Sequence, residues 1–144
     1  MPHILWSTHW RGGPAARTVE PGTEVAVGVT EFVTRRPWST PSVGTAGMRL
    51  RRTWPATPGA VGMWLWVDVG PRMNRSGSIT VWTAHEHLTG FVARPDHRRI
   101  VRAHRDRGTL RSATWTAPFT SPAALRASAW RLVSGTAPWP TPPD

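Results

Sequence analysis

Alternating apolar and polar residues along the stretch from Thr23 to Val33 predict a half-buried β-strand. Val25, Val27 and Val29 fall on one face of this strand, and small residues fall on the other. A second strand is expected from Ala60 to Val69, where both faces carry mainly apolar side chains. A strand with two apolar faces predicts that both faces of the sheet are covered.

Two more strands follow in the sequence. A turn from Gly70 to Arg75 leads into an antiparallel return strand over Ser76 to Trp82. A fourth strand is expected over Thr109 to Ala117, centred on Trp115. These four stretches predict a single antiparallel sheet of four strands.

A helix is expected between the first and second strands, because apolar residues recur there at helical spacing. The stripe starts at Val43 and ends at Trp54, and Thr40-Pro41 before it is typical of an N-cap followed by proline at the first helical position. A terminal helix is expected to open at Ser121-Pro122. The remaining tail, APWPTPPD, is proline-rich and is expected to be extended.

The third and fourth strands are joined by a helical element that is split in two. Its first half is expected to open at a capping box, in which Thr83 accepts the Glu86 amide and Glu86 reaches back. Its second half is expected from Pro95 to Arg107, with Asp96 complementing the N-terminal dipole.

The resulting order, β-α-β-β-α-β with an extra C-terminal helix, predicts an α+β fold of the ferredoxin-like split β-α-β type, with its helices on one face of the sheet. The domain is expected to span residues 23–118, between an irregular lead-in (1–22) and a C-terminal helix with its tail (119–144). Trp64 and Trp66 lie in the second strand, and an open sheet face would leave them in water. A homodimer through that face is therefore expected.

Charge and composition narrow the possible functions. The net charge of +10 comes from arginine alone, and the arginines are spread along the chain among acidic residues, which argues against a nucleic-acid-binding stripe. The absence of cysteine excludes disulfides and thiolate metal sites. No signal-peptide segment and no apolar run near about 20 residues is visible, so a cytoplasmic location without membrane association is expected.

Four segments carry a family resemblance: PGAVGMWLWVDV, SGSITVW, HLTGFVARPDHRRIVRAHR and SATWTA. With them, residues 23–117 resemble the antibiotic-biosynthesis-monooxygenase-like dimeric α/β barrels, above all small actinobacterial monooxygenase-like proteins. A fainter likeness is to spheroidene-monooxygenase-like haem proteins. The resemblance implies a dimeric α/β barrel and a tailoring oxygenase of secondary metabolism, although this fold hosts several chemistries.

The helix from Pro95 to Arg107 carries the candidate chemistry. His97, Ile100, Val101 and His104 are spaced to share one stripe, with the neighbouring arginines outside it. A histidine facing a cavity can act as a general base, as a donor to a substrate oxygen or as an axial haem ligand. The resemblance places the iron-bound histidine of haem-degrading relatives near Val101, one turn from either histidine. The alternative is that these histidines are structural, with their ring nitrogens hydrogen-bonded to a backbone carbonyl or a nearby aspartate.

A flat substrate pocket between the sheet and the helices is expected around these histidines. Aromatic rings there serve either as core or as a wall for a planar ligand. The arginines of the first helix, Arg49, Arg51 and Arg52, form either a solvated face or a clamp for an anionic group such as a haem propionate. The expected pocket residues are Trp82, Phe91, Ile100, Trp115, Leu50 and Trp54.

No metal site is expected. His85 and His87 are two positions apart, and on a helix such side chains point about 200° apart, so they do not share one ion.

The leading hypothesis is a monooxygenase for a planar hydrophobic substrate, with His97 or His104 as the base. A haem protein with one of these histidines as the iron ligand, and a non-catalytic module that binds hydrophobic ligands, are the alternatives.

Overall fold

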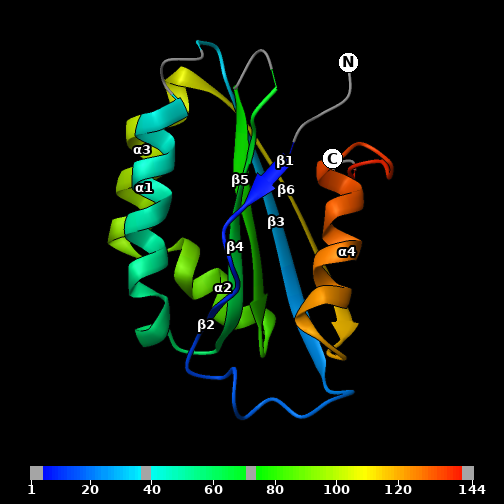
Figure 1. Ribbon diagram of the computed structural model, residues 1–144. Helices are drawn as coiled ribbons and strands as arrows, with labels where there is room; N and C mark the ends of the chain where they lie inside the picture. Colours follow the sequence, from blue (N-terminus) through cyan, green and yellow to red (C-terminus); the bar gives the residue numbers. More distant parts are fainter. Residues whose placement is uncertain (1–4, 37–39, 71–73, 141–144) are drawn as a thin grey trace.

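The central strand of the sheet, β3 (Glu24–Thr34), is flanked on both sides by antiparallel partners (Figure 1). The computed structural model describes residues 5–36, 40–70 and 74–140. The strands lie in the order β4-β5-β3-β6, which is the ferredoxin-like order, so the predicted α+β fold is confirmed. The partners of β3 are β5 (Arg75–Trp82) and β6 (Gly108–Pro118), and β4 (Ala60–Asp68) pairs with the far side of β5.

Two short strands extend the sheet beyond the four that were expected. β1 (Leu5–Ser7) and β2 (Arg11–Gly12) both pair with β4, which gives a six-stranded sheet. They lie in the segment expected to be irregular. Neither strand is long enough to show an alternating pattern, so periodicity did not reveal them.

Helices cover both faces of the sheet. The core helices α1, α2 and α3 lie on one face, as expected, and the extra C-terminal helix α4 lies on the other (Figure 1). A Ser121 cap begins α4, because the Ser121 hydroxyl oxygen accepts a hydrogen bond from the Ala124 amide at 3.1 Å. The four helices are α1 (Thr40–Thr53), α2 (His85–Val92), α3 (Pro95–His104) and α4 (Pro122–Val133).

The apolar face beneath α4 contains the two tryptophans that were expected at a dimer interface. Trp64 and Trp66 are only 4% and 2% exposed, because Leu125 and Ala129 of α4 and Trp10 of the lead-in pack in the same cluster. The expectation that these tryptophans lie on an open face is therefore wrong. The homodimer itself stays a prediction.

Trp10 is fitted closely against β4. Its ring lies 4.5 Å from that of Trp64, and a Cβ atom on Gly62 would come within 1.9 Å of the Trp10 ring. Glycine at position 62 therefore permits the ring to lie flat on the strand. The lead-in segment thus helps to cover the sheet.

The C-terminal region is also tied to the sheet by charge. Glu31, 2% exposed on β3, forms ion pairs with Arg75 at 2.6 Å and Arg111 at 2.7 Å. Arg75 also donates to the Val133 carbonyl at 2.8 Å, and Arg111 lies over the ring of Trp139. The buried carboxylate thus links the sheet to the end of α4; the last residues of the proline-rich tail, 141–144, lie outside the described residues.

The expected capping box is absent. Helix α2 begins at His85, and its N-cap is Ala84, which makes no side-chain hydrogen bond. The Thr83 amide instead donates to the Gly59 carbonyl at 2.9 Å. The chain is therefore held to the loop before β4 at this point, and Thr83 lies one residue too early to cap the helix.

We expect the variant Ala129→Glu to lower the free energy of unfolding by about 3 kcal/mol or more, because it buries an unpaired carboxylate between α4 and the sheet. Urea unfolding followed by circular dichroism measures this. Ala127→Glu, on the exposed side of the same helix, is the matched control and should change it by less than about 0.5 kcal/mol. Equal effects of the two variants would contradict the placement of α4.

Candidate functional site

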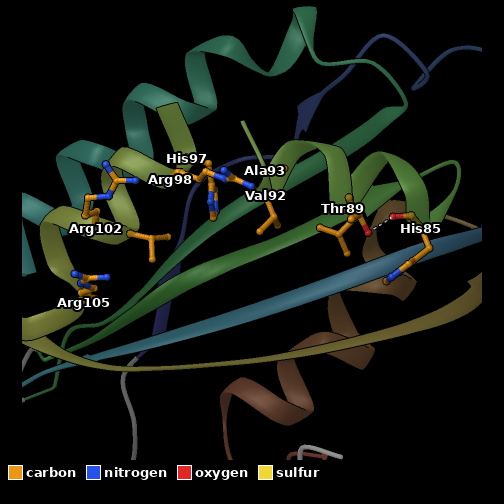
Figure 2. Close-up of a pocket in the computed structure, with 10 residues that line it drawn as sticks. His85, Thr89, Val92, Ala93, His97, Arg98, Arg102 and Arg105 are labelled. Carbon is orange, nitrogen blue, oxygen red and sulfur yellow. Dashed lines mark hydrogen bonds between the residues drawn. The ribbon is translucent and has the colours of Figure 1, made fainter. Parts of the chain in front are cut away.

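A groove of about 570 Å³ lies along helices α2 and α3, open to solvent on one side. The side chains of His85, Thr89, Val92 and His97 extend from the two helices toward the strands (Figure 2). Apolar atoms make up most of its surface. The lining residues are His85, Leu88, Thr89, Val92, Ala93, His97, Arg98, Val101, Arg102 and Arg105.

The junction between α2 and α3 fixes the shape of the groove. Arg94 has extended backbone angles (φ −61°, ψ 144°), as expected for a residue before proline, and this separates the two helices. The Arg94 guanidinium pairs with Asp96 and donates to the hydroxyls of Thr57 at 3.1 Å and Thr53 at 3.3 Å. Arg94 therefore anchors the junction to the end of α1.

Asp96 holds the first turn of α3. One carboxylate oxygen accepts the His97 backbone amide at 2.9 Å, and the same carboxylate accepts the Arg94 guanidinium. Burial by itself raises the pKa of Asp96, but these hydrogen bonds outweigh it and hold the pKa below the ordinary value. Asp96 is therefore ionised and sets the start of the helix that carries His97.

His97 lies at the centre of the groove with a ring that is held in place. Its ring meets that of Phe91 edge-on, with centroids 5.2 Å apart. Its Nδ1 atom is buried and has no hydrogen-bond partner among the described residues. Burial lowers the pKa of His97, and Arg94 acts in the same direction, while Asp96 and a backbone hydrogen bond with Val92 oppose it. The imidazole is therefore neutral at pH 7.

His104 is placed differently from His97. It is 8% exposed and does not line the groove. Its Nδ1 atom is also buried without a described partner, and burial, followed by the charge of Arg107, lowers its pKa. The two histidines share one helix, but only His97 can meet a ligand bound in the groove.

The other residues expected in the pocket are separated by the fold. Trp54 and Trp82 have no exposed surface and pack together, with ring centroids 4.8 Å apart. Phe91 and Leu50 belong to the same cluster, in which Phe91 lies between this core and His97. These rings support the groove from beneath rather than line it.

Two predicted pocket residues lie elsewhere. Trp115 packs with the cluster under α4, on the opposite face of the sheet from His97. Ile100 is half-buried on α3 and is not among the groove residues. Of the predicted stripe, only His97 and Val101 line the groove.

The arginines of α1 are not part of this groove. Arg51 donates to the His9 carbonyl at 3.2 Å, which ties α1 to the lead-in. Arg49 and Arg52 are exposed on the outer side of the helix. A clamp formed by these three residues therefore does not face His97.

Sequence reasoning missed most of the cationic lining. Arg98, Arg102 and Arg105 were assigned to the solvent side of α3, yet they line the groove beside His97 and Val101. Their spacing of four and three residues shows in the sequence that they share one flank of a helix. The sequence does not show what this flank borders, because that depends on how α3 packs beside α1.

The groove residues do not fit a haem. A haem needs apolar walls on both faces of its ring and a ligand directed at the iron. The lining residues come from α2 and α3, from Ala93 between them and from Arg105 after α3, so they form one wall, and Val101 occupies the position that the resemblance assigns to the ligand. Within the described ranges, no cluster of three or more His, Asp or Glu side chains is placed to hold a metal ion.

The architecture has counterparts among solved structures. A structure described as SnoaB, a cofactor-independent oxygenase from Streptomyces nogalater, shares 25% identity with this chain at a TM-score of 0.53, covering 69% of this chain and 98% of SnoaB. A point mutant of SnoaB matches over the same shares at 28% identity and a TM-score of 0.50.

More distant matches show the same fold. A structure described as a putative antibiotic biosynthesis monooxygenase from Nitrosomonas europaea has a TM-score of 0.57 at 8% identity, covering 72% of this chain and 96% of that one. No protein-family model and no curated protein sequence matches the chain.

No helix in the described part of the chain has the length and apolar character that a bilayer span requires.

The lowered pKa of His97 predicts how stability depends on pH. The unfolded chain protonates this histidine near pH 6.5, before the folded protein does, so the free energy of unfolding falls as pH drops below about 6.5 toward the lowered pKa. We expect His97→Gln to flatten this fall in urea titrations between about pH 7 and pH 5. His85→Gln, an exposed groove histidine, is the control and should keep the wild-type slope. An unchanged slope in His97→Gln would contradict the burial of the ring.

Proposed function

We propose that this chain, which has the ferredoxin-like fold of the antibiotic-biosynthesis-monooxygenase-like superfamily, is a monooxygenase for a planar hydrophobic substrate bound in the α2–α3 groove. His97 is the proposed general base. The neighbouring structure at 25% identity, described as a cofactor-independent oxygenase, supports this class of reaction.

The position of His97 is the observation that carries the proposal. Its ring lines a largely apolar groove, and its lowered pKa leaves the imidazole neutral at pH 7. A neutral imidazole can accept a proton, whereas an imidazolium cannot. Phe91 and the Asp96-anchored first turn of α3 hold the ring in one place, as a base requires.

A phenolic substrate with an activated ring methylene accounts for the chemistry without a further reductant. His97 takes the phenolic proton, and the resulting anion is electron-rich enough to reduce dioxygen. The methylene carbon becomes a carbonyl: it gains one oxygen atom and loses two hydrogens, which leave with the second oxygen atom as water. The substrate supplies all the electrons, and the groove keeps the anion next to the cationic side chains of α3.

The arginines stabilise the anion more than the neutral phenol. Arg98, Arg102 and Arg105 line the groove on the same flank of α3 as Val101. A positive field lowers the cost of removing a proton from a ligand held beside it. The reaction therefore divides between His97, which accepts the proton, and the arginines, which favour the charge that remains.

We expect purified protein to consume dioxygen with 1,8-dihydroxyanthrone as the probe, and His97→Gln to lower kcat/KM by about 100-fold or more, the usual contribution of a general base. An oxygen electrode measures uptake, and chromatography measures the quinone product. The rate should rise with pH through the lowered pKa of His97 and then level off.

His104→Gln is the matched control. It removes the other histidine of the predicted stripe from a site outside the groove, so the catalysed rate should stay within about threefold of wild type. Equal losses in both variants, or full activity in His97→Gln, would contradict His97 as the base. Binding of the probe without oxygen uptake by wild-type protein would favour a non-catalytic binding module.

A further inference from the structure

We infer that the α2–α3 groove selects an aromatic carboxylate, with the carboxylate at Arg102 and Arg105 and the ring system across His97 and Val92. This substrate class rests on the proposed function, which by itself requires only a planar phenol. The added claim concerns a second, permanently charged group on the ligand.

The groove carries positive charge that nothing in its lining balances. Arg98, Arg102 and Arg105 form no ion pair within the described residues, whereas Arg94 on the same segment is paired with Asp96. No described lining residue is an acid. A guanidinium presents a planar fork that matches a carboxylate, so these side chains are suited to a ligand anion rather than to structure.

The charge occupies one half of the groove. Figure 2 shows Arg102 and Arg105 at one end, Arg98 beside His97 in the middle, and Val92, Thr89 and His85 toward the other end. A ligand with one anionic end and one apolar body is therefore oriented along the groove. The same orientation brings its ring system, rather than its carboxylate, to the His97 imidazole.

The apolar part of the groove is exposed in a way that suits a ligand. Val92 and Val101 are 47% and 37% exposed and both line the groove, so they present apolar surface to a bound ring system. His97 and Arg102 are five residues apart, or about 7.5 Å along the helix axis, so the base and the carboxylate site are separated by about the length of a fused ring system. The spacing thus accommodates both contacts at once.

The experiment compares two fluorescent probes of nearly the same shape, 2-naphthoate and its uncharged amide, 2-naphthamide. We expect wild-type protein at low salt to bind 2-naphthoate about tenfold more tightly than the amide, because the two exposed arginines form charge-assisted hydrogen bonds with the carboxylate alone. In Arg102→Gln/Arg105→Gln the preference should fall to within about twofold, and in wild-type protein it should weaken as salt is added.

The control variant carries the same change in net charge. Arg49→Gln/Arg99→Gln removes two exposed arginines that do not line the groove and should keep the tenfold preference. Equal losses in the two double variants would show a general field effect and overturn the inference, as would equal binding of the two probes, or no binding of 2-naphthoate, by wild-type protein.

A further variant separates this inference from the proposed function. His97→Gln should keep the preference for 2-naphthoate while it loses oxygenation. Wild-type protein that prefers 2-naphthoate but consumes no dioxygen with the anthrone probe would refute the monooxygenase and leave the carboxylate site standing. Oxygenation that depends on His97, without any preference for the carboxylate, would do the reverse.

Discussion

The two apolar faces of β4 impose the constraint on which the rest of the structure depends. Trp64 and Trp66 point to one side of this strand, and Met63 points to the other, so neither face can be left in water. The chain meets this requirement by itself. Helices α1 to α3 cover one face, and α4 with Trp10 covers the other, so β4 is buried on both sides within one subunit.

The covering of the sheet determines where a ligand can bind. Trp54, Trp82 and Phe91 fill the space between the helices and the sheet, which leaves no room there for the expected pocket. The unfilled space lies farther along, on the flank of α2 and α3, where Arg94 anchors the junction. His97 stands at this boundary, with Phe91 on its core side and the groove on the other.

The fold was largely predictable from sequence because its signals are local. Alternation marked β3, a run with two apolar faces marked β4, and Ser121-Pro122 marked the start of α4. The position of α4 was not predictable, since its apolar stripe fits either a partner or its own sheet. The capping box at Thr83 does not form, because the Thr83 amide that would donate to Glu86 in this motif donates to the Gly59 carbonyl instead.

The site was predictable only in part, for a similar reason. Periodicity placed His97 and Val101 together, and both line the groove. It also grouped His104 with them, although the turn into β6 buries that residue. The cationic flank was assigned to solvent, because charge on a helix is ordinarily solvated and only packing shows that this flank borders a hollow.

Whether His97 is the base can be measured by selective ¹⁵N NMR of the histidine rings. Without dioxygen, 1,8-dihydroxyanthrone cannot be oxidised, so its contact with each imidazole can be followed in the resting complex. We expect the ring nitrogens of His97 to shift toward the protonated form as the ligand is added, while those of His104 stay in place. A shift at His104 instead, or no shift at either ring in the presence of bound ligand, would contradict His97 as the base.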